Sequence, residues 1–196
     1  HPNIARLLDG GTGEDDRPYF VMEYIEGEPI DAYANARHLS IPERLRLFLQ
    51  VCAAVSYAHG RRVIHRDIKP ANTLVTAEGV PKLLDFGIAK VLDPGAEEAT
   101  ASMTGFRLLT PEYASPEQVE GRPATAASDT YSLGVVLYEL LTGCSPYGAT
   151  SRDPLAVSDA VRSTDPERPS AAGEPVDRQQ LRGDLDVIVL TALRKE

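Results

Sequence analysis

Apolar residues cover most positions of the stretch Ile41–His59, which predicts a helix that is buried on several sides. Its start is well marked, because Ser40 stands three residues before Glu43, the spacing of a capping box, and Pro42 lies in the first turn. Gly60 follows directly and is expected to end the helix. The pattern therefore predicts one long core helix here.

A second strongly apolar stretch, Leu133–Leu141, is hydrophobic all round, so we expect it to form the central core helix. Ser128 and Asp129 precede it as candidate caps, and Gly143 follows it as the end signal. Shorter helices are expected over Ile30–Arg37, Pro154–Ser163 and Asp184–Arg194. The last of these is expected to face inward with its apolar residues, which are Leu185, Ile188, Val189, Ala192 and Leu193.

Two short apolar segments, Ile4–Leu8 and Pro18–Tyr24, flank an acidic, glycine-rich turn and predict a pair of strands. The glycines Gly10, Gly11 and Gly13 could instead form a phosphate-binding loop. However, GxGxxG spacing is absent, neither a Lys-Ser/Thr pair nor a helix follows, and the turn is acidic where phosphate would sit. A plain hairpin turn is the preferred interpretation.

A second hairpin is predicted from Thr73–Thr76 and Pro81–Leu84, which are joined by a short turn. Asn72 and Asp85 lie at its two open ends, so the hairpin should bring these polar residues close together. After it, residues 90–117 are polar, turn-rich and without periodicity. A loop of that length is uncommon unless it has a function, and we expect this one to be regulatory.

The composition fits one globular domain, with 196 residues, 42% of them hydrophobic and 25% charged. A net charge of -9 argues against a general affinity for nucleic acid. No apolar run approaches about 18 residues, so no membrane segment is expected in this chain. Cys52 and Cys144 stand far apart in apolar helical patterns, which argues against a disulfide or metal motif and favours the cytoplasm.

The residues that can carry chemistry are concentrated in His65–Asn72, which reads His-Arg-Asp-Ile-Lys-Pro-Ala-Asn, and in Asp85-Phe86-Gly87. Carboxylate, ammonium and amide oxygen groups at this spacing suit phosphate and magnesium. Taken singly, each has a plainer interpretation: Asp-Phe-Gly is usually a turn, and a lone His beside a strand is usually a core residue. The combination indicates function, because each fixed position matches by chance only about once in twenty.

These segments, together with Thr110–Glu117 and Ser128–Gly134, resemble the catalytic loop, magnesium loop, Ala-Pro-Glu-type segment and central helix of protein kinases. The amino-acid sequence of these segments is similar to that of bacterial serine/threonine kinases of the eukaryotic-like type. The resemblance implies an α+β, protein kinase-like fold. Residues 1–25 would be a remnant of the N-terminal lobe, with its fourth and fifth strands and the hinge. Residues 26–196 would be a mainly helical C-terminal lobe, incomplete at its C-terminal end.

The resemblance also implies roles for the polar residues of the two loops. Asp67 would orient the acceptor hydroxyl and take its proton, while Lys69 would neutralise charge on the transferred phosphoryl group. Asn72 and Asp85 would hold two magnesium ions, since Mg2+ takes few protein ligands and fills its shell with water and phosphate oxygens. The implied cofactors are ATP and Mg2+.

Adenine contacts are implied in the same way. Glu23 and Ile25 would meet adenine through their backbone groups, Met22 would close the back of the pocket, and Leu74 would form its floor. Thr73 departs from the family pattern, because it brings a hydroxyl to a position that is usually apolar, at an expected mild cost. Three apolar or aromatic residues, Leu7, His65 and Phe86, resemble members of the hydrophobic spine that forms in active kinases.

Lys69 and Thr110 resemble the serine/threonine branch of the family, so the expected partners are protein substrates that offer Ser or Thr hydroxyls. Arg66, directly before Asp67, could pair with a phosphate on the long loop and order it. The candidate regulatory residues are Arg66, Thr100, Ser102, Thr104 and Thr110.

Several parts of a kinase active site are missing from this sequence. The Gly-rich loop, the strand Lys that holds the α and β phosphates, and its partner Glu are absent, and no Lys occurs before Lys69 that could replace the strand Lys. The late Arg that usually pairs with the equivalent of Glu117 is absent too. We expect a truncated, itself inactive, part of a serine/threonine kinase. A non-catalytic, kinase-like binding module is the alternative, while oligomeric state and any downstream membrane or repeat domain stay open.

Overall fold

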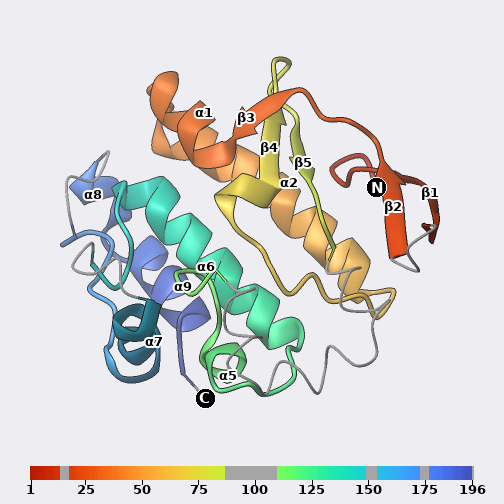
Figure 1. Cartoon of the computed structure of the whole chain (residues 1–196). Coiled ribbons are helices and arrows are strands. Elements are labelled where there is room, and N and C mark those ends of the chain that lie inside the picture. Colours follow the sequence, from red (N-terminus) through yellow and green to blue (C-terminus); the bar gives the residue numbers. More distant parts are fainter. Residues whose placement is uncertain (14–17, 87–109, 149–153, 173–176, 196) are drawn as a thin grey trace.

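The computed structural model describes residues 1–13, 18–86, 110–148, 154–172 and 177–195. The fold is α+β, as predicted, with two small sheets beside a helical body (Figure 1). The strands are β1 (Leu7–Thr12), β2 (Pro18–Met22), β3 (Gly27–Pro29), β4 (Thr73–Thr76) and β5 (Pro81–Leu83). The helices are α1 (Ile30–Ala36), α2 (Ile41–His59), the 3-10 helix η1 (Pro70–Asn72), α5 (Pro116–Val119), α6 (Ala126–Thr142), α7 (Pro154–Ser163), α8 (Arg178–Leu181) and α9 (Asp184–Ala192).

The predicted first hairpin is confirmed, because β1 and β2 pair in antiparallel fashion. Its strand β1 begins later than expected and contains Gly10 and Gly11, which the sequence placed in the turn. The assignment of these two glycines was wrong because backbone pairing with β2 continues through them. The intervening residues 14–17 lie outside the described part of the chain.

The second sheet has the order β3-β4-β5, and both of its pairings are antiparallel. The β4–β5 hairpin was predicted, whereas β3 was not. At its open end the backbone N–H of Leu84 donates to the carbonyl of Asn72 over 2.8 Å. This bond brings the segment that leads into Asp85 directly beside Asn72, as the hairpin prediction required.

The long helix α2 has the predicted bounds and start. The Ser40 backbone N–H donates to Oε2 of Glu43 over 2.8 Å, which completes one half of the capping box. The prediction of burial on several sides was wrong for the outer face, where Leu49 is 64% exposed. The buried Arg44 on the inner face donates to the carbonyl of Leu140 over 2.8 Å and so joins α2 to α6.

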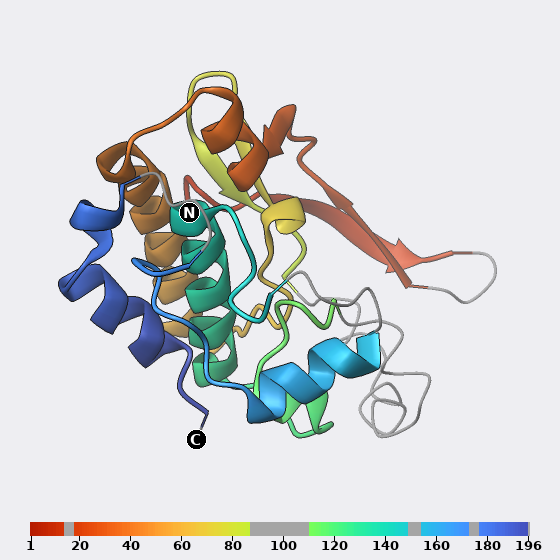
Figure 2. The same cartoon turned by 90° about the vertical axis from the view of Figure 1, so that its left-hand side faces the viewer.

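Helix α6 runs through the centre of the helical body, between α2 and α9 (Figure 1). Figure 2 shows the helical body from the side, with the β1–β2 hairpin projecting away from it. It is buried along almost its whole length, as predicted, and ends at Gly143 with φ of 73°, a left-handed conformation that suits glycine. The predicted start was wrong, because the N-cap is Thr125 and Ser128 completes its capping box from inside the first turn. Asp129 therefore lies inside the helix, and its side chain does not cap the helix start but is available for contacts with other segments.

The C-terminal helices pack against α6 and α5. Helix α7 has the predicted bounds, α9 ends at Ala192, and α8 was not predicted. Gly134 of α6 allows close packing with α9, because a Cβ at this position would lie 2.9 Å from Cβ of Ala192. Val189 and Leu193 are buried as expected, but the inward assignment of Ile188 was wrong, since it is 54% exposed.

Candidate active site

The backbone of Arg66 is held from two sides, by α6 and by α5. Its N–H donates to Oδ1 of Asp129 over 2.8 Å, and its carbonyl accepts from Nε2 of Gln118 over 2.8 Å. Arg66 has φ of 73°, in the left-handed region that residues other than glycine rarely adopt. Such a conformation costs about 1–3 kcal/mol and persists only where the surroundings hold it. These bonds therefore fix the direction in which the next residue, Asp67, leaves the loop.

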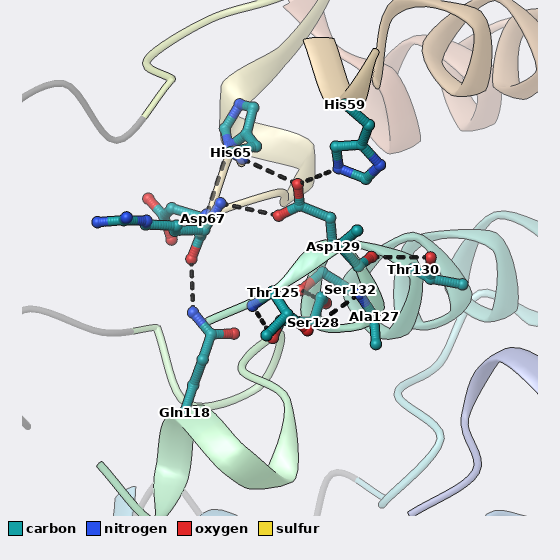
Figure 3. A network of polar contacts seen from close by, with 12 residues as sticks. His59, His65, Asp67, Gln118, Thr125, Ala127, Ser128, Asp129, Thr130 and Ser132 are labelled. Carbon is teal, nitrogen blue, oxygen red and sulfur yellow. Dashed lines mark hydrogen bonds and ion pairs between the residues drawn. The ribbon is translucent and has the colours of Figure 1, made fainter. Parts of the chain in front are cut away.

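Asp129 gathers donors from two parts of the chain (Figure 3). Its Oδ2 accepts from the backbone N–H of His65 over 2.8 Å and lies 2.7 Å from Nε2 of His59. The side chain is only 1% exposed, and a buried carboxylate is tolerated when it has such partners. The sequence offered Asp129 as a helix cap, whereas in the structure its carboxylate anchors the loop that begins at His65.

The ring of His65 is fully buried between the loop and the second hairpin. Its Nε2 lies 2.8 Å from the carbonyl of Leu84, and its Nδ1 accepts from the backbone N–H of Asp67 over 3.3 Å. A carbonyl can only accept, so Nε2 carries the proton and Nδ1 is free of one, which makes the ring neutral. Burial lowers the pKa of His65 and so favours the same neutral form.

Three of the predicted catalytic residues meet at the carboxylate of Asp67. Nζ of Lys69 lies 2.8 Å from Oδ2 of Asp67, and Nδ2 of Asn72 donates to the same oxygen over 2.9 Å. Lys69 also donates to Oγ1 of Thr110 over 2.8 Å. The structure thus brings together a carboxylate, an ammonium and an amide, and ties them to the segment that precedes α5.

The short helix η1 explains how a local sequence achieves this convergence. Pro70 lies at its first position, where a missing N–H costs nothing, and the N–H of Asn72 donates to the carbonyl of Lys69 over 3.0 Å. The fully buried Thr73 donates its hydroxyl to that carbonyl over 3.1 Å. Its departure from the family pattern therefore leaves no unpaired hydroxyl in the core.

Asn72 and Asp85 offer hard oxygen ligands of the kind that Mg2+ prefers. Because Nδ2 of Asn72 faces Asp67, the amide oxygen is the atom left to face a metal. Asp85 is exposed and has φ of 53°, again in the left-handed region. Among the described residues no group of three or more His, Cys, Asp or Glu side chains could hold a metal. This donor set fits a metal ion that takes its other ligands from phosphate and water.

A pocket of about 360 Å³ lies where the first hairpin meets the second sheet. The four residues that the sequence proposed for adenine, Met22, Glu23, Ile25 and Leu74, all line it. Phe20, Tyr24 and Leu84 line it as well and were not singled out in the sequence, because no motif distinguishes apolar pocket residues from core residues.

The remaining predicted residues fall into two groups. Thr100, Ser102 and Thr104 lie outside the described part of the chain. Of the three spine candidates, His65 and Phe86 have ring centroids 4.7 Å apart, whereas Leu7 on β1 is 57% exposed.

Comparison with known proteins assigns the family. A model of the protein kinase domain matches residues 1–172. The chain belongs to the protein kinase family. The serine/threonine-protein kinase PknB of Mycobacterium tuberculosis is 38% identical to it over 199 residues, which cover 100% of this chain. The serine/threonine-protein kinase PrkC of Bacillus subtilis is 43% identical over 172 residues, which cover 87% of the chain.

The kinase relatives are much longer than this chain, which spans 30% of PknB and 25% of PrkC. Membership in the family implies ATP and, in general, a divalent metal. The predicted family and α+β kinase fold are therefore confirmed. In the described ranges, no helix combines the length and apolar character that crossing a membrane requires.

Proposed function

We propose that the full-length protein transfers the γ-phosphate of ATP to Ser or Thr hydroxyls of protein substrates. The observation that carries this proposal is the convergence of Lys69 and Asn72 on one carboxylate oxygen of Asp67, 2.8 and 2.9 Å away. The similarity to relatives named serine/threonine-protein kinases supports the choice of acceptor. In this assignment residues 1–25 belong to the N-terminal lobe and hinge, and residues 26–196 to the C-terminal lobe.

The proposed mechanism assigns one task to each group. Asp67 orients the acceptor hydroxyl and accepts its proton, which a positioned base can do with a rate gain of about 10²–10⁴. Lys69 neutralises charge on the phosphoryl group in transfer, as positioned cations do in such sites. Asn72 and Asp85 would hold Mg2+, which supplies charge neutralisation at the phosphates. The pocket between β2 and β4 would take the adenine ring, in contact with Met22, Glu23, Ile25 and Leu74.

The test is a phosphotransfer assay on the full-length protein with a generic protein acceptor. Asp67→Asn should lower kcat by about 10²–10⁴, because the amide cannot accept the proton. Asp159→Asn, which changes an exposed carboxylate on α7, is the matched control and should retain full kcat. Equal kcat for Asp67→Asn and the unchanged protein would show that Asp67 is not the proton acceptor. No phosphotransfer at all, with nucleotide still bound, would instead favour the non-catalytic module.

We further propose that Arg66 pairs with a phosphate carried on Thr100, Ser102 or Thr104 and that this ion pair orders the loop. The ordering of the loop would affect the active site through Thr110, because the hydroxyl of Thr110 accepts a hydrogen bond from Lys69. Replacing the three loop residues with Ala should lower the kcat of the full-length protein, and unchanged kcat would contradict the idea. The chemistry requires ATP, so we place the domain on the cytoplasmic side.

A further inference from the structure

The peptide unit between Arg66 and Asp67 is held on both of its edges. Its carbonyl, on Arg66, accepts from Nε2 of Gln118 over 2.8 Å, and its N–H, on Asp67, donates to Nδ1 of His65 over 3.3 Å. A peptide unit is planar, so bonds on opposite edges fix how the whole plane is turned. The Cα of Asp67 is one corner of that plane. The direction of the Asp67 side chain therefore depends on both bonds.

The two bonds come from different parts of the fold. His65 belongs to the same loop, and its Nε2 lies 2.8 Å from the carbonyl of Leu84. Gln118 belongs to α5, 52 positions further along the chain than Arg66. Figure 3 shows the Gln118 side chain pointing from α5 toward the loop. Gln118 therefore connects the position of α5 to the orientation of Asp67.

The amide of Gln118 can hold the Arg66 carbonyl in one orientation only. Its Oε1 accepts from the backbone N–H of Ser115 over 3.1 Å and from the Ser115 hydroxyl over 3.2 Å. Turning the amide by 180° would place its oxygen against the Arg66 carbonyl and its NH2 group against the Ser115 N–H, so like groups would meet at both ends. Ser115 thus orients the amide so that its NH2 group faces Arg66.

The Gln118 bond differs from the one that Asp129 makes to the same residue. Asp129 accepts from the Arg66 N–H, which belongs to the preceding peptide unit. Gln118 is 7% exposed and Ser115 is 0% exposed, and a buried polar group that loses its partner keeps the cost of desolvation. Since Arg66 is already in the left-handed region, loss of the Gln118 donor should let the following peptide unit turn.

We propose that Gln118 is a positioning residue for phosphoryl transfer: its amide, oriented by Ser115, holds the Arg66–Asp67 peptide unit so that the Asp67 carboxylate faces the acceptor hydroxyl. The proposal rests on the proposed kinase function. The pocket assigned to nucleotide is lined by other residues, at 20, 22–25, 74 and 84. Loss of the Gln118 donor should therefore lower kcat and leave KM for ATP unchanged.

The experiment compares four variants of the full-length protein: Gln118→Met, Gln118→Glu, Ser115→Ala and Thr142→Val. Phosphotransfer kinetics from about pH 6 to about pH 8.5 are measured together with urea unfolding and hydrogen exchange of the Asp67 amide. Thr142→Val is the matched control, because Thr142 is buried and its hydroxyl donates to the carbonyl of Tyr138 over 2.8 Å, at the C-terminal end of α6. This variant should lose stability and retain kcat.

Gln118→Met keeps the length of the side chain but has no donor. Its kcat should fall about tenfold, with KM for ATP within about twofold of the unchanged protein, and its Asp67 amide should exchange faster. Ser115→Ala removes the hydroxyl but keeps the backbone N–H that orients the amide. Its kcat should therefore fall only about two- to threefold.

Gln118→Glu provides a readout that a loss of stability alone would not produce. Its carboxylate cannot donate to the Arg66 carbonyl, whereas a protonated carboxyl has one O–H donor and one acceptor oxygen, as the amide does. Burial raises the pKa of a carboxyl group, so this one should take up its proton at about pH 6 to 7. The ratio of its kcat to that of the unchanged protein, in which the titration of Asp67 cancels, should rise at least about fivefold from pH 8.5 to pH 6.

A kcat of Gln118→Met equal to that of Thr142→Val would overturn the proposal, and so would a Gln118→Glu ratio that does not change with pH. Gln118→Met decides the question if the carboxylate prevents folding. The unchanged protein might instead lack phosphotransfer while its Asp67 amide exchanges more slowly than in Gln118→Met and equally to Thr142→Val. That result would refute the kinase proposal and support the hold of Gln118 on the loop.

Discussion

Nζ of Lys69 donates to Oγ1 of Thr110 over 2.8 Å, although the two residues lie 41 positions apart in the sequence. The same ammonium lies 2.8 Å from Oδ2 of Asp67. Lys69 therefore joins the proposed catalytic base to the segment that leads into α5. A change at Thr110 should reach Asp67 through this single side chain.

We predict that Thr110→Val lowers kcat of the full-length protein about tenfold, because Lys69 loses the hydroxyl that holds its ammonium in place. Thr110→Ser keeps the hydroxyl and should stay within about twofold of the unchanged protein. The kinetics of phosphotransfer to a protein acceptor measure both. Equal activity of the Val and Ser variants would show that the bond has no part in catalysis.

Loss of the Asp129 carboxylate should damage both stability and catalysis. Asp129→Ala would leave the donors on His59, His65 and Arg66 without their acceptor, at a cost of about 3 kcal/mol in the free energy of unfolding. The variant would also remove the hydrogen bond that holds the Arg66 backbone in its left-handed conformation, and the position of Asp67 depends on that conformation. Urea unfolding and phosphotransfer kinetics, measured where the variant remains folded, check the two effects.

Asp186→Ala is the matched control for this prediction. Asp186 on α9 is also buried, and it accepts from the backbone N–H and hydroxyl of Ser170, 2.9 and 2.7 Å away. The variant should lose stability without a selective fall in kcat. If Asp129→Ala and Asp186→Ala lose kcat equally when both are folded, the anchoring role of Asp129 is wrong.

The carboxyl of Glu139 should make stability depend on pH. Burial raises its pKa to about 7, and the charges of Asp31 and Glu112 add to the increase, while the hydrogen bond from Tyr113, 2.8 Å long, opposes it. The folded state then binds more protons than the unfolded state between pH 4.5 and pH 7, so this group lowers stability as pH rises through that window.

Glu139→Gln should therefore gain stability relative to the unchanged protein as pH rises from about 5 to about 8. The free energy of unfolding in urea, measured at both pH values, checks the change in slope. His65 contributes a slope of opposite sign, because its pKa is lowered by burial, but it is present in both proteins and cancels in the comparison. Identical pH slopes would mean that Glu139 titrates in its ordinary range.

The contact between α6 and α9 should not tolerate a methyl group at Gly134. In Gly134→Ala the new Cβ would lie 2.9 Å from Cβ of Ala192 and 3.1 Å from Cδ2 of Leu193. We predict a loss of about 1–3 kcal/mol in the free energy of unfolding, because this overpacking must push the helices apart. Adding Ala192→Gly should recover part of the loss. Thermal and urea unfolding of the three variants measure it.

Patterns within a few residues determined most secondary structure. The Ser40–Glu43 capping box, the Gly143 end signal and the β4–β5 turn act over distances that the chain itself fixes. The placement of Gly10 and Gly11 failed because strand pairing continued through them. The inward assignment of Ile188 failed because the helix pattern does not say which neighbours will cover it.

By itself, the sequence determined the family, the fold class and the residues proposed for catalysis, because these depend on residue types at fixed local spacing. Only the tertiary structure decided that Asp129 holds the backbone of Arg66, 63 positions away, and that Oε1 of Glu23 lies 3.5 Å from Nζ of Lys82. Both contacts arise from the packing of distant segments. Local patterns carry no signal for such contacts, since the position of each partner is set by the whole core.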